Sequence, residues 1–375
     1  MKSKKLLKLL GAIVLAAVIA MAFVPGCAAP EPVPGPAGPA GPAGPAAPAP
    51  APVPAPAPEP ELTEPLRWRM HTHTSIGAPE VIEMQRFCAN IIRDTNSMID
   101  ITFYPASALG YKGEEVADVV EAGLLEIGEL CLAWIAGGNP ILNLPHLPFL
   151  MSENQQMALK AYPAMEPYIK AELGKRDLAV LYFGPGGGLS YLCSKEPCTT
   201  VADWDGKKFR AWSEAQNKWF PWLGTTPVSM SSGEQYLALS TGAIEGVIQG
   251  PGSAIDRKVY EVCSYYNLWG EAPSCYVIVM QKSRLEALPQ KYQDIIWERA
   301  DELTERLWQA SYLDAPLRLE ELRKLCTVLD VSPEEMAKMR AIVIPYWDEW
   351  LEAAGPQGLE ALNAAMVAMG YEEYR

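Results

Sequence analysis

Residues 66–104 read LRWRMHTHTSIGAPEVIEMQRFCANIIRDTNSMIDITFY, and this stretch decides the fold class. The run at 66–70 predicts a short strand, which leads into His71-Thr72-His73-Thr74-Ser75. The segment 79–97 predicts a helix, because its apolar residues recur at helical spacing. These residues are Val81, Ile82, Met84, Phe87, Ile91 and Ile92. A second strand is predicted at 99–104, so the stretch is a β-α-β unit, which is typical of sheets with helices on their faces.

The same alternation continues along the chain. Further helices are predicted at 113–122, 153–173, 213–222 and 233–241. Further strands are predicted at 126–131, 178–183, near 191, and at 208–211, 226–230, 243–249 and 276–280. From 283 to 374 nearly everything reads as helix, with breaks at Pro316, Pro333, Pro345 and Pro356. This order predicts an α/β protein with mainly parallel sheets and a long helical C-terminal region.

The amino terminus predicts export. Lysines within residues 2–8 precede an apolar stretch at 9–24, which has the length of a signal peptide and is short for a membrane span. Val24-Pro25-Gly26-Cys27 resembles a bacterial lipobox, so we expect lipidation at Cys27; an uncleaved anchor is the alternative. Residues 28–65 are almost entirely Pro, Ala and Gly, and they predict an extended linker.

The charge of the chain excludes one class of partner. The formal net charge is −14, and no run of Lys and Arg occurs after the first eight residues. A nucleic-acid-binding protein needs a basic face, so no nucleic-acid partner is expected. The roughly 310 residues that follow the linker are enough for two domains with buried cores.

Several motifs carry only weak predictions. Gly184-Pro185-Gly186-Gly187-Gly188 follows a strand, but no Lys-Ser/Thr comes after it, so a turn or an interdomain crossover is favoured over a phosphate cradle. His71 and His73 would share one face of an extended segment and could begin a metal site. His146 is the only other histidine in the chain, so we predict no metal.

The cysteines and nucleophile motifs give no prediction of catalysis. Cys193 and Cys198 could form a disulfide in an oxidising compartment, or they could be buried thiols like the other cysteines of the chain. No Gly-x-Ser-x-Gly elbow is present, and nothing pairs a particular cysteine with a histidine. We therefore predict no catalytic residue and no cofactor.

One segment has the chemistry of a carboxylate receptor. If 208–212 is a strand, Arg210 and Trp212 project from the same face. A guanidinium binds a carboxylate through two parallel hydrogen bonds, and an adjacent indole can cover an apolar ligand body. The alternative is a surface arginine stacked on a tryptophan.

At this segment the sequence resembles the solute-binding proteins of tripartite ATP-independent periplasmic (TRAP) transporters, in their lipoprotein form. The resemblance covers about 66–374, and its segments keep the order and spacing of the family. These segments are Phe103-Tyr104-Pro105-Ala106-Ser107-Ala108-Leu109-Gly110, Leu144-Pro145-His146-Leu147-Pro148-Phe149-Leu150, Ala202-Asp203-Trp204-Asp205-Gly206-Lys207-Lys208-Phe209-Arg210, Pro227-Val228, and 233–246, which reads GEQYLALSTGAIEG.

The resemblance implies a two-domain fold of the type II periplasmic-binding-protein kind, with hinge-crossing strands, a long C-terminal helical region and a ligand held in the cleft. We expect a first domain of 66–187 plus about 275–314 and a second of 188–274 plus about 315–375. They follow a signal peptide at 1–26 and the lipidated linker at 27–65.

The resemblance also implies the site. In this family the arginine at the position of Arg210 typically binds the ligand carboxylate, and a polar residue at the position of Gln249 commonly lines the cleft. Many members carry a second arginine where Ser190 stands here. Its absence favours an apolar or aromatic monocarboxylate, or a 2-oxo acid. The remaining predicted ligand-binding residues are Trp212, Trp134 and His73, with Trp219 and Trp222 either near the cleft or in the core.

The predicted function is therefore capture of an organic anion without chemistry. The partners implied are the TRAP permease subunits, which an ion gradient drives, and the membrane that holds the lipid anchor, on the periplasmic or extracytoplasmic face. The alternatives are a dicarboxylate or sugar-acid receptor of the same family, an exported lipoprotein hydrolase, and a scaffolding lipoprotein. The hydrolase would show paired perturbed carboxylates in a cleft, and the scaffold an exposed apolar patch.

Overall fold

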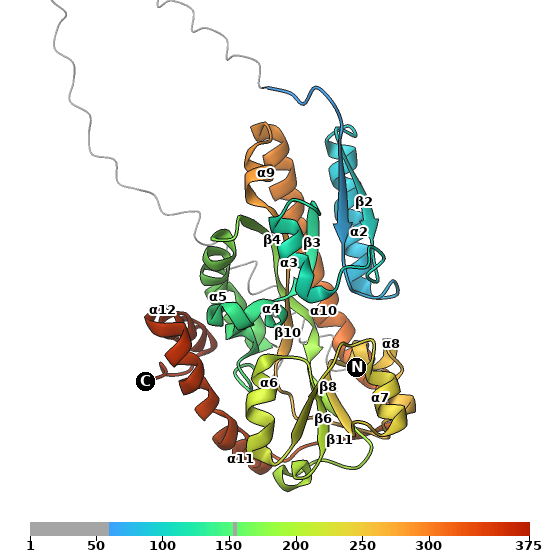
Figure 1. Ribbon diagram of the computed structural model, residues 1–375, viewed down its shortest axis with the longest axis vertical. Helices are drawn as coiled ribbons and strands as arrows, with labels where there is room; N and C mark the ends of the chain where they lie inside the picture. Colours follow the sequence, from blue (N-terminus) through green and yellow to red (C-terminus); the bar gives the residue numbers. More distant parts are fainter. Residues whose placement is uncertain (1–59, 153–155) are drawn as a thin grey trace, which may run out of the picture. The chain divides into compact units, whose positions relative to one another are not determined.

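The structure is a computed structural model that describes residues 60–152 and 156–375. The predicted signal peptide, Cys27 and most of the linker lie outside these residues, as do 153–155 at the start of a predicted helix. Residues 60–65, the described part of the linker, contain neither helix nor strand. Among the described residues, no helix combines the length and apolar character that crossing a membrane requires. Two β-sheets with flanking helices make up the fold (Figure 1).

The first sheet contains the opening β-α-β unit. Its strand order is β2-β1-β3-β10-β4. Strand β1 is parallel to β2 and β3, whereas β10 is antiparallel to β3 and β4. The strands are β1 (Leu66–His71), β2 (Ile99–Tyr104), β3 (Ile127–Cys131), β4 (Leu178–Leu189) and β10 (Pro273–Gln281).

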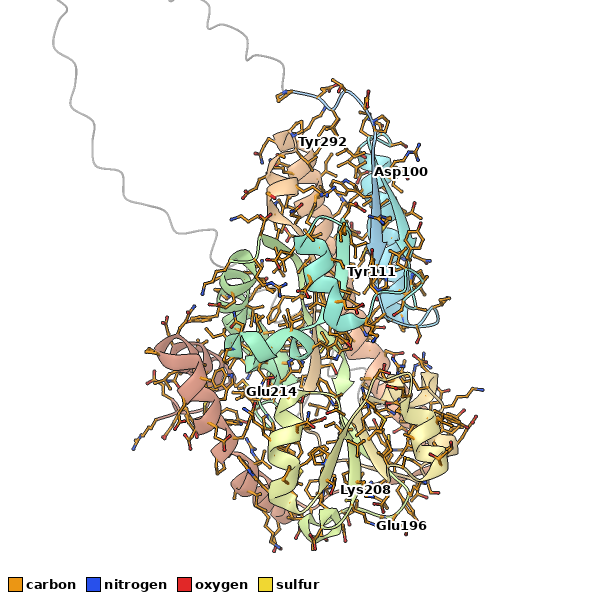
Figure 2. The ribbon with its side chains drawn as sticks, viewed as in Figure 1. Asp100, Tyr111, Glu196, Lys208, Glu214 and Tyr292 are labelled. Atoms are coloured by element: carbon orange, nitrogen blue, oxygen red, sulfur yellow. The ribbon has the colours of Figure 1, made fainter. Side chains whose placement is uncertain are left out.

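The second sheet has the order β11-β9-β5-β8-β6-β7. Strand β6 is parallel to β7 and β8, and β9 is parallel to β11, whereas β5 is antiparallel to β8 and β9. The strands are β5 (Tyr191–Ser194), β6 (Lys208–Ala211), β7 (Thr226–Ser229), β8 (Gly246–Gln249), β9 (Tyr265–Asn267) and β11 (Thr327–Leu329). Figure 2 shows Lys208 at the end of this sheet farther from the first sheet and Glu214 at the nearer end, so β6 runs toward the first sheet.

Most of the helices lie where the apolar spacing predicts them, whereas α4 and α8 were not predicted. The α-helices are α2 (Pro79–Asp94), α3 (Val116–Glu121), α4 (Leu132–Ile135), α5 (Gln156–Gly174), α6 (Glu214–Trp219), α7 (Gln235–Thr241), α8 (Pro251–Asp256), α9 (Lys282–Glu286), α10 (Gln290–Leu325), α11 (Pro333–Val343) and α12 (Pro345–Met369). Short 3-10 turns are η1 (Gly113–Glu115), η2 (Ala136–Gly138), η3 (Pro140–His146), η4 (Val201–Trp204), η5 (Phe220–Leu223) and η6 (Val259–Glu261).

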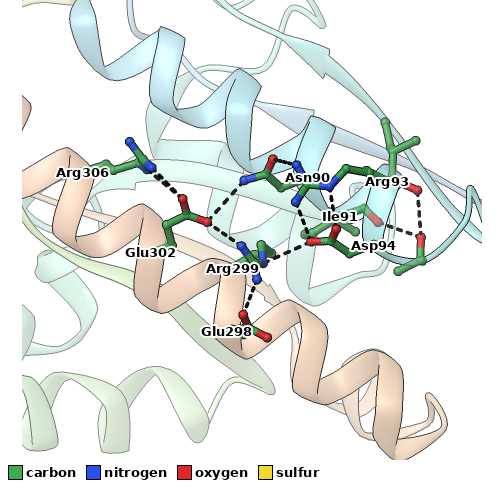
Figure 3. A network of polar contacts seen from close by, with 10 residues as sticks. Asn90, Ile91, Arg93, Asp94, Glu298, Arg299, Glu302 and Arg306 are labelled. Carbon is green, nitrogen blue, oxygen red and sulfur yellow. Dashed lines mark hydrogen bonds and ion pairs between the residues drawn. The ribbon is translucent and has the colours of Figure 1, made fainter.

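Helix α2 is fixed at both of its ends. Its first turn holds Pro79 and Glu80 and its last turn holds Arg93, a charge order that suits the helix dipole. Near its C-terminus it is joined to α10 by a polar network (Figure 3), in which Arg299 Nε lies 3.3 Å from Asp94 Oδ2. Asn90 Nδ2 also donates to an oxygen of Glu302. These contacts hold the C-terminal part of α2 against α10.

Helix α10 connects the cores of the two sheets. Its residues from Tyr292 to Leu307 pack in the core of the first sheet, and Leu322 packs in a core beneath the second sheet. Figure 1 shows the helix running alongside β4 and reaching α8. One long helix therefore contributes to both halves of the described structure.

Two predictions from the sequence were wrong: the strand directions and the helix break at Pro316. The sheets are mixed rather than mainly parallel, because β10 and β5 carry the same apolar pattern as parallel strands but run in the opposite direction. Pro316 does not break α10, because the helix packs against β4, α2 and α8 along its length. Pro333 and Pro345 begin α11 and α12 as predicted, and the backbone turns non-helical at Gly355, just before Pro356.

The glycine-rich segment is a strand rather than a turn. Strand β4 continues through it to Leu189, and Gly184 pairs with Tyr276 of β10. A Cβ at Gly184 would press on Trp308, and one at Gly186 would overlap the ring of Tyr276. Glycine is therefore required because aromatic rings lie directly on the backbone.

The predicted boundaries of the two domains stay a prediction. The contacts of α12 are chiefly with α5 and η3, both of which lie in the predicted first domain, although 345–369 were expected in the second. These contacts favour the first domain for α12.

Candidate functional site

A cavity of about 160 Å³ lies between the two sheets. Its walls include residues at or just beyond the carboxyl ends of strands β1, β3, β6 and β8, which is where ligands bind in open α/β sheets. The glycines of β4, Tyr276 of β10, and the first turns of α2 and α8 complete it, together with Asp314 and Ala315 of α10.

All six side chains predicted from the sequence line this cavity. They are His73, Trp134, Ser190, Arg210, Trp212 and Gln249. Trp219 and Trp222 do not line it, because Trp219 is fully buried in the core and Trp222 lies on the surface. The structure thus brings together residues that are up to 176 positions apart in the chain, from His73 to Gln249.

Arg210 has the geometry of an anion receptor. The side chain is only 7% exposed, and its Nε donates to the carbonyl of Met230 at 3.1 Å. Its two terminal nitrogens make no hydrogen bond or ion pair with the described residues. Burial, and secondarily the charge of Arg257, lower the pKa of Arg210 to about 10. A buried guanidinium with two free donors is stabilised by a carboxylate that enters the cavity.

A second guanidinium, which was not predicted from the sequence, also lines the cavity. Arg257, just after α8, lines the same cavity. Its Nε donates to Ser253 Oγ at 3.2 Å and its Nη1 to the carbonyl of Ser232 at 3.5 Å. The missing arginine at Ser190 therefore does not leave Arg210 as the only cation, and the short helix α8 that brings Arg257 here had no clear periodic signal.

An aromatic wall stands beside these charges. His73 stacks on Tyr276 with ring centroids 5.2 Å apart, and Trp134 meets both rings edge to face. Trp212 contacts His146 edge to face at 5.7 Å, and its backbone N–H donates to Gln216. These rings give the cavity flat apolar surfaces on which a ligand can pack.

The amide pair beside Arg210 is held by its own hydrogen bond. Gln235 Nε2 donates to Gln249 Oε1 at 3.0 Å, and both side chains line the cavity. Gln235 is almost completely buried and its Oε1 has no hydrogen-bond partner among the described residues. Gln235 was not predicted, although it stands in the GEQYLALSTGAIEG segment.

Glu129 organises the end of β1. Its buried carboxylate accepts from the hydroxyls of Thr72 and Thr74 and lies 3.2 Å from His73 Nδ1. Burial is the largest effect on the pKa of Glu129 and raises it, but His73 and the two hydroxyls together outweigh burial and lower the pKa. This carboxylate is therefore already paired, and it fixes the orientation of His73.

Other carboxylates at the cavity were not predicted either. Glu80 of α2, Asp256 of α8 and Asp314 of α10 all line it. Burial, and secondarily repulsion from Asp314, Glu129 and Asp256, raise the pKa of Glu80 to about 7. Their meeting depends on the packing of α2 and α8 against α10, which no local sequence pattern encodes.

The one cysteine and histidine pair near the cavity is inert. Cys131 Sγ lies 3.6 Å from His146 Nε2, and both residues are buried. Burial raises the pKa of Cys131 to about 12 and lowers that of His146 to about 3, so neither group is charged near neutral pH. The seven described cysteines, including Cys193 and Cys198, are free thiols. Within 60–152 and 156–375, no group of three or more potential ligands could hold a metal ion.

Glu271, whose backbone N–H donates to the carbonyl of Ser190, should make stability depend on pH. Burial raises its pKa to about 8 from 4.5, and the donated bonds of Gln216 Nε2 oppose this only in part. The carboxyl group of Glu271 therefore loses its proton at lower pH in the unfolded chain than in the folded one. The contribution of this group to folding stability is fully present below about pH 4.5 and is lost as the pH rises to about 8.

Glutamine has no proton to lose, so Glu271→Gln should remove this loss of stability at high pH. We measure the melting temperatures of the variant and the native protein by thermal unfolding. The variant should gain in melting temperature relative to the native protein at pH 8, and it should gain less at pH 5. Glu286→Gln, at an exposed glutamate of α9, is the control. An equal difference at both pH values would contradict the assignment of this pH dependence to Glu271.

Comparison with known proteins identifies the family. The family model described as bacterial extracellular solute-binding protein, family 7, matches residues 70–353. The C4-dicarboxylate-binding periplasmic protein DctP of Rhodobacter capsulatus is 24% identical over 285 residues, which are 72% of this chain and 82% of the relative.

Solved structures show the same fold. DctP6, a Bordetella pertussis extracytoplasmic solute receptor binding pyroglutamic acid, matches with a TM-score of 0.76 at 22% identity, over 80% of this chain and 99% of that chain. A marine metagenome TRAP solute-binding protein specific for pyroglutamate, from an unidentified microbe, matches with a TM-score of 0.75 at 25% identity, over 80% and 99% of the two chains. The predicted two-domain α/β fold is confirmed by these matches.

The predicted family is likewise confirmed, and the members of this family are transport receptors rather than enzymes. The uncharged pair of Cys131 and His146 and the unpaired guanidinium of Arg210 agree with a site that binds its ligand without catalysing a reaction. The chain belongs to family 7 of the bacterial extracellular solute-binding proteins, the periplasmic receptors that bind small organic acids and work with TRAP permease subunits.

Proposed function

We propose that this receptor captures a monocarboxylate with an apolar or aromatic body, or a 2-oxo acid, and that Arg210 binds the carboxylate. The observation that carries the proposal is the buried guanidinium with two terminal nitrogens that engage no described residue. Two parallel hydrogen bonds to a carboxylate would satisfy both nitrogens and place a negative charge beside the buried positive one.

The walls of the cavity support the apolar body of this ligand. Trp134, Trp212 and Tyr276 offer rings, and Gln249, Ser190 and His73 offer polar atoms for orientation. A cavity of about 160 Å³ is small compared with the roughly 300–1,000 Å³ of sites for drug-sized molecules, which favours a small metabolite.

Capture would proceed by closure of the two expected domains around the solute. The cavity takes its walls from both sheets, so a hinge motion between them would open and close it. In the sequence-based division, 66–187 with about 275–314 form one domain and 188–274 with about 315–375 the other. The contacts of α12 with α5 and η3 support assigning that helix to the first domain instead. The closed receptor would deliver its solute to a permease driven by an ion gradient.

We also propose that the protein is exported and held at the extracytoplasmic face by lipid on Cys27. The lipobox-like Val24-Pro25-Gly26-Cys27 supports the anchor, and the Pro, Ala and Gly linker supports a receptor that reaches away from the membrane.

A dicarboxylate or sugar acid is a second candidate ligand, and one observation favours it. Arg257 supplies a second guanidinium to the cavity, and a second acidic or oxygen-rich group could bind there.

A thermal-shift screen distinguishes these ligands. A solute that binds the folded protein at about a hundred times its Kd adds about 2.7 kcal/mol of stability. We therefore expect an increase in melting temperature of about 5 °C from the best aromatic or branched monocarboxylate or 2-oxo acid. Succinate and glucuronate are the comparison compounds. A larger shift with these two would favour the second candidate, and shifts only with neutral sugars or peptides would overturn the carboxylate proposal.

A further inference from the structure

Among the described residues that line the cavity, acidic side chains outnumber arginines. Arg210 and Arg257 are the arginines that line it, whereas four carboxylates do so: Glu80, Glu129, Asp256 and Asp314. Glu129 is paired with His73. Asp314 is paired with Arg318, whose Nε lies 3.1 Å from Asp314 Oδ1.

The carboxyl group of Glu80 lacks such a partner. It makes no ion pair and no hydrogen bond with the side chain of any described residue, and its own backbone N–H is the one donor that acts on it. The neighbouring charges that act on it are those of Asp314, Glu129 and Asp256, which are all negative. A partly buried carboxylate among carboxylates is stabilised by a cation that comes from outside the protein.

Asp256, unlike Glu80, has positively charged neighbours. Burial raises the pKa of Asp256, but the guanidinium groups of Arg318 and Arg257 oppose this rise and favour the charged form, and the residue is exposed. Of the four carboxylates, Glu80 is thus the one without a positive neighbour in the described structure.

An independent feature shows that the same cavity is built for a ligand. Arg210 lines the cavity and is more than nine-tenths buried, and its terminal nitrogens have no partner among the described residues. Arg210 comes from β6 in the second sheet, whereas Glu80 comes from α2, which packs on the first sheet through β2. Among the described residues, the cavity therefore holds one unpaired cation, Arg210, and one unpaired anion, Glu80, on elements that belong to different sheets.

We propose that the solute is a zwitterion, and that Glu80 binds its protonated amine while Arg210 binds its carboxylate. This inference rests on the proposed role of Arg210 and narrows the ligand class to carboxylates that also carry a basic nitrogen. Each end of such a ligand satisfies one unpaired group, and the net charge of the cavity does not change when it binds.

Because Glu80 and Arg210 lie on elements of different sheets, the amine of the ligand would also help to close the two domains around it. A ligand that bridges Arg210 and Glu80 contacts both sheets at once and stabilises the closed arrangement more than an acid that engages Arg210 alone. Glu80 is thus a specificity-determining residue for the amine, and the aromatic rings contact the part of the solute between its two charges.

Matched pairs of compounds test this inference. The pairs are L-valine with isovalerate, L-phenylalanine with 3-phenylpropanoate, and 4-(aminomethyl)benzoate with 4-methylbenzoate; the first member of each adds an amine to nearly the same skeleton. Affinities are measured by calorimetric titration at pH 8 on the native protein, on Glu80→Gln and on Glu83→Gln. Glu83 lies one turn later on α2, pairs with Arg86, and does not line the cavity.

The expected result is a preference of at least tenfold for the amine-bearing member of the best pair. That preference should disappear in Glu80→Gln, which should still bind the member without the amine, and it should persist in Glu83→Gln. Retained binding of the simple acid shows that the variant is folded and that Arg210 still functions.

Acid should weaken the same preference. Protonation of Glu80, whose pKa lies near 7 in the free protein, removes the charge that holds the amine, so the preference should fall from pH 8 to pH 5.5. Asp314, Glu129, Asp256, His73, Arg257 and Arg318 also surround this part of the cavity. The assignment therefore requires that Glu80→Gln show no such pH dependence.

Three outcomes would overturn the inference. Equal or tighter binding of the simple acids by the native protein would refute the zwitterion while leaving the carboxylate proposal intact, as would a preference that survives in Glu80→Gln. If no member of any pair binds, the carboxylate proposal fails together with this one.

Discussion

Arg210→Ala should lower the affinity for the natural solute by about thirtyfold to a few thousandfold. Truncating one partner of a buried, hydrogen-bonded charge pair costs about 2–5 kcal/mol, and each 1.4 kcal/mol is about a factor of ten. The solute carboxylate would be left in a cavity where Arg257 is the only other arginine. Calorimetric titration with the best compound of the thermal-shift screen measures the loss.

Arg210→Lys separates charge from geometry. Lysine keeps the positive charge but cannot form the two parallel hydrogen bonds of a guanidinium. We expect its affinity to lie between that of the native protein and that of the alanine variant. Arg67→Ala, at a surface arginine of β1 with 83% of its side chain exposed, should bind as the native protein does.

The fold should survive the loss of Arg210, which makes the test interpretable. Without a ligand the guanidinium is buried and repelled by Arg257, so its removal should not lower the melting temperature of the free protein. Normal affinity in a folded Arg210→Ala protein would show that the carboxylate binds elsewhere.

Gly186→Ala should damage both stability and binding. The added Cβ would overlap the ring of Tyr276, and atoms near the root of that ring are involved, so the whole side chain must move. Tyr276 stacks on His73 and lines the cavity, so its displacement changes the aromatic wall. Overpacking of this kind costs about 1–3 kcal/mol.

Thermal unfolding and titration together measure this effect. We expect a melting temperature lower by several degrees and a weaker affinity. Gly174→Ala is the matched control, because a Cβ at the end of α5 meets no atom within 4 Å. Unchanged melting temperature and affinity in Gly186→Ala would show that Tyr276 relaxes without cost and that the glycine is not required there.

The helices and most strands could be predicted from the sequence because their signals are local. Helical spacing in 79–97 predicted α2 within three residues. Strand direction could not be predicted, because buried parallel and antiparallel strands share one apolar pattern. The glycines of β4 were misread for a related reason, since the rings that lie on them come from β10 and α10, far away in the chain.

The residues of the site likewise fall into those that could be predicted from the sequence and those that could not. Arg210 stands in a segment that resembles the family, and Trp212 and Gln249 follow such segments by two and three residues, so their meeting in one cavity could be predicted. Glu80 and Arg257 could not, because their roles arise from the packing of α2 and α8 against α10 and from the absence of a partner. A charge without a partner is visible only when every neighbour is known.

The role of Arg210 can be tested by a crystal structure of the protein with its tightest solute. We expect a carboxylate within hydrogen-bond distance of both terminal nitrogens of Arg210, with the solute body against Trp134, Trp212 or Tyr276. A solute bound in the cavity with no acidic group on Arg210, or bound outside the cavity, would contradict it.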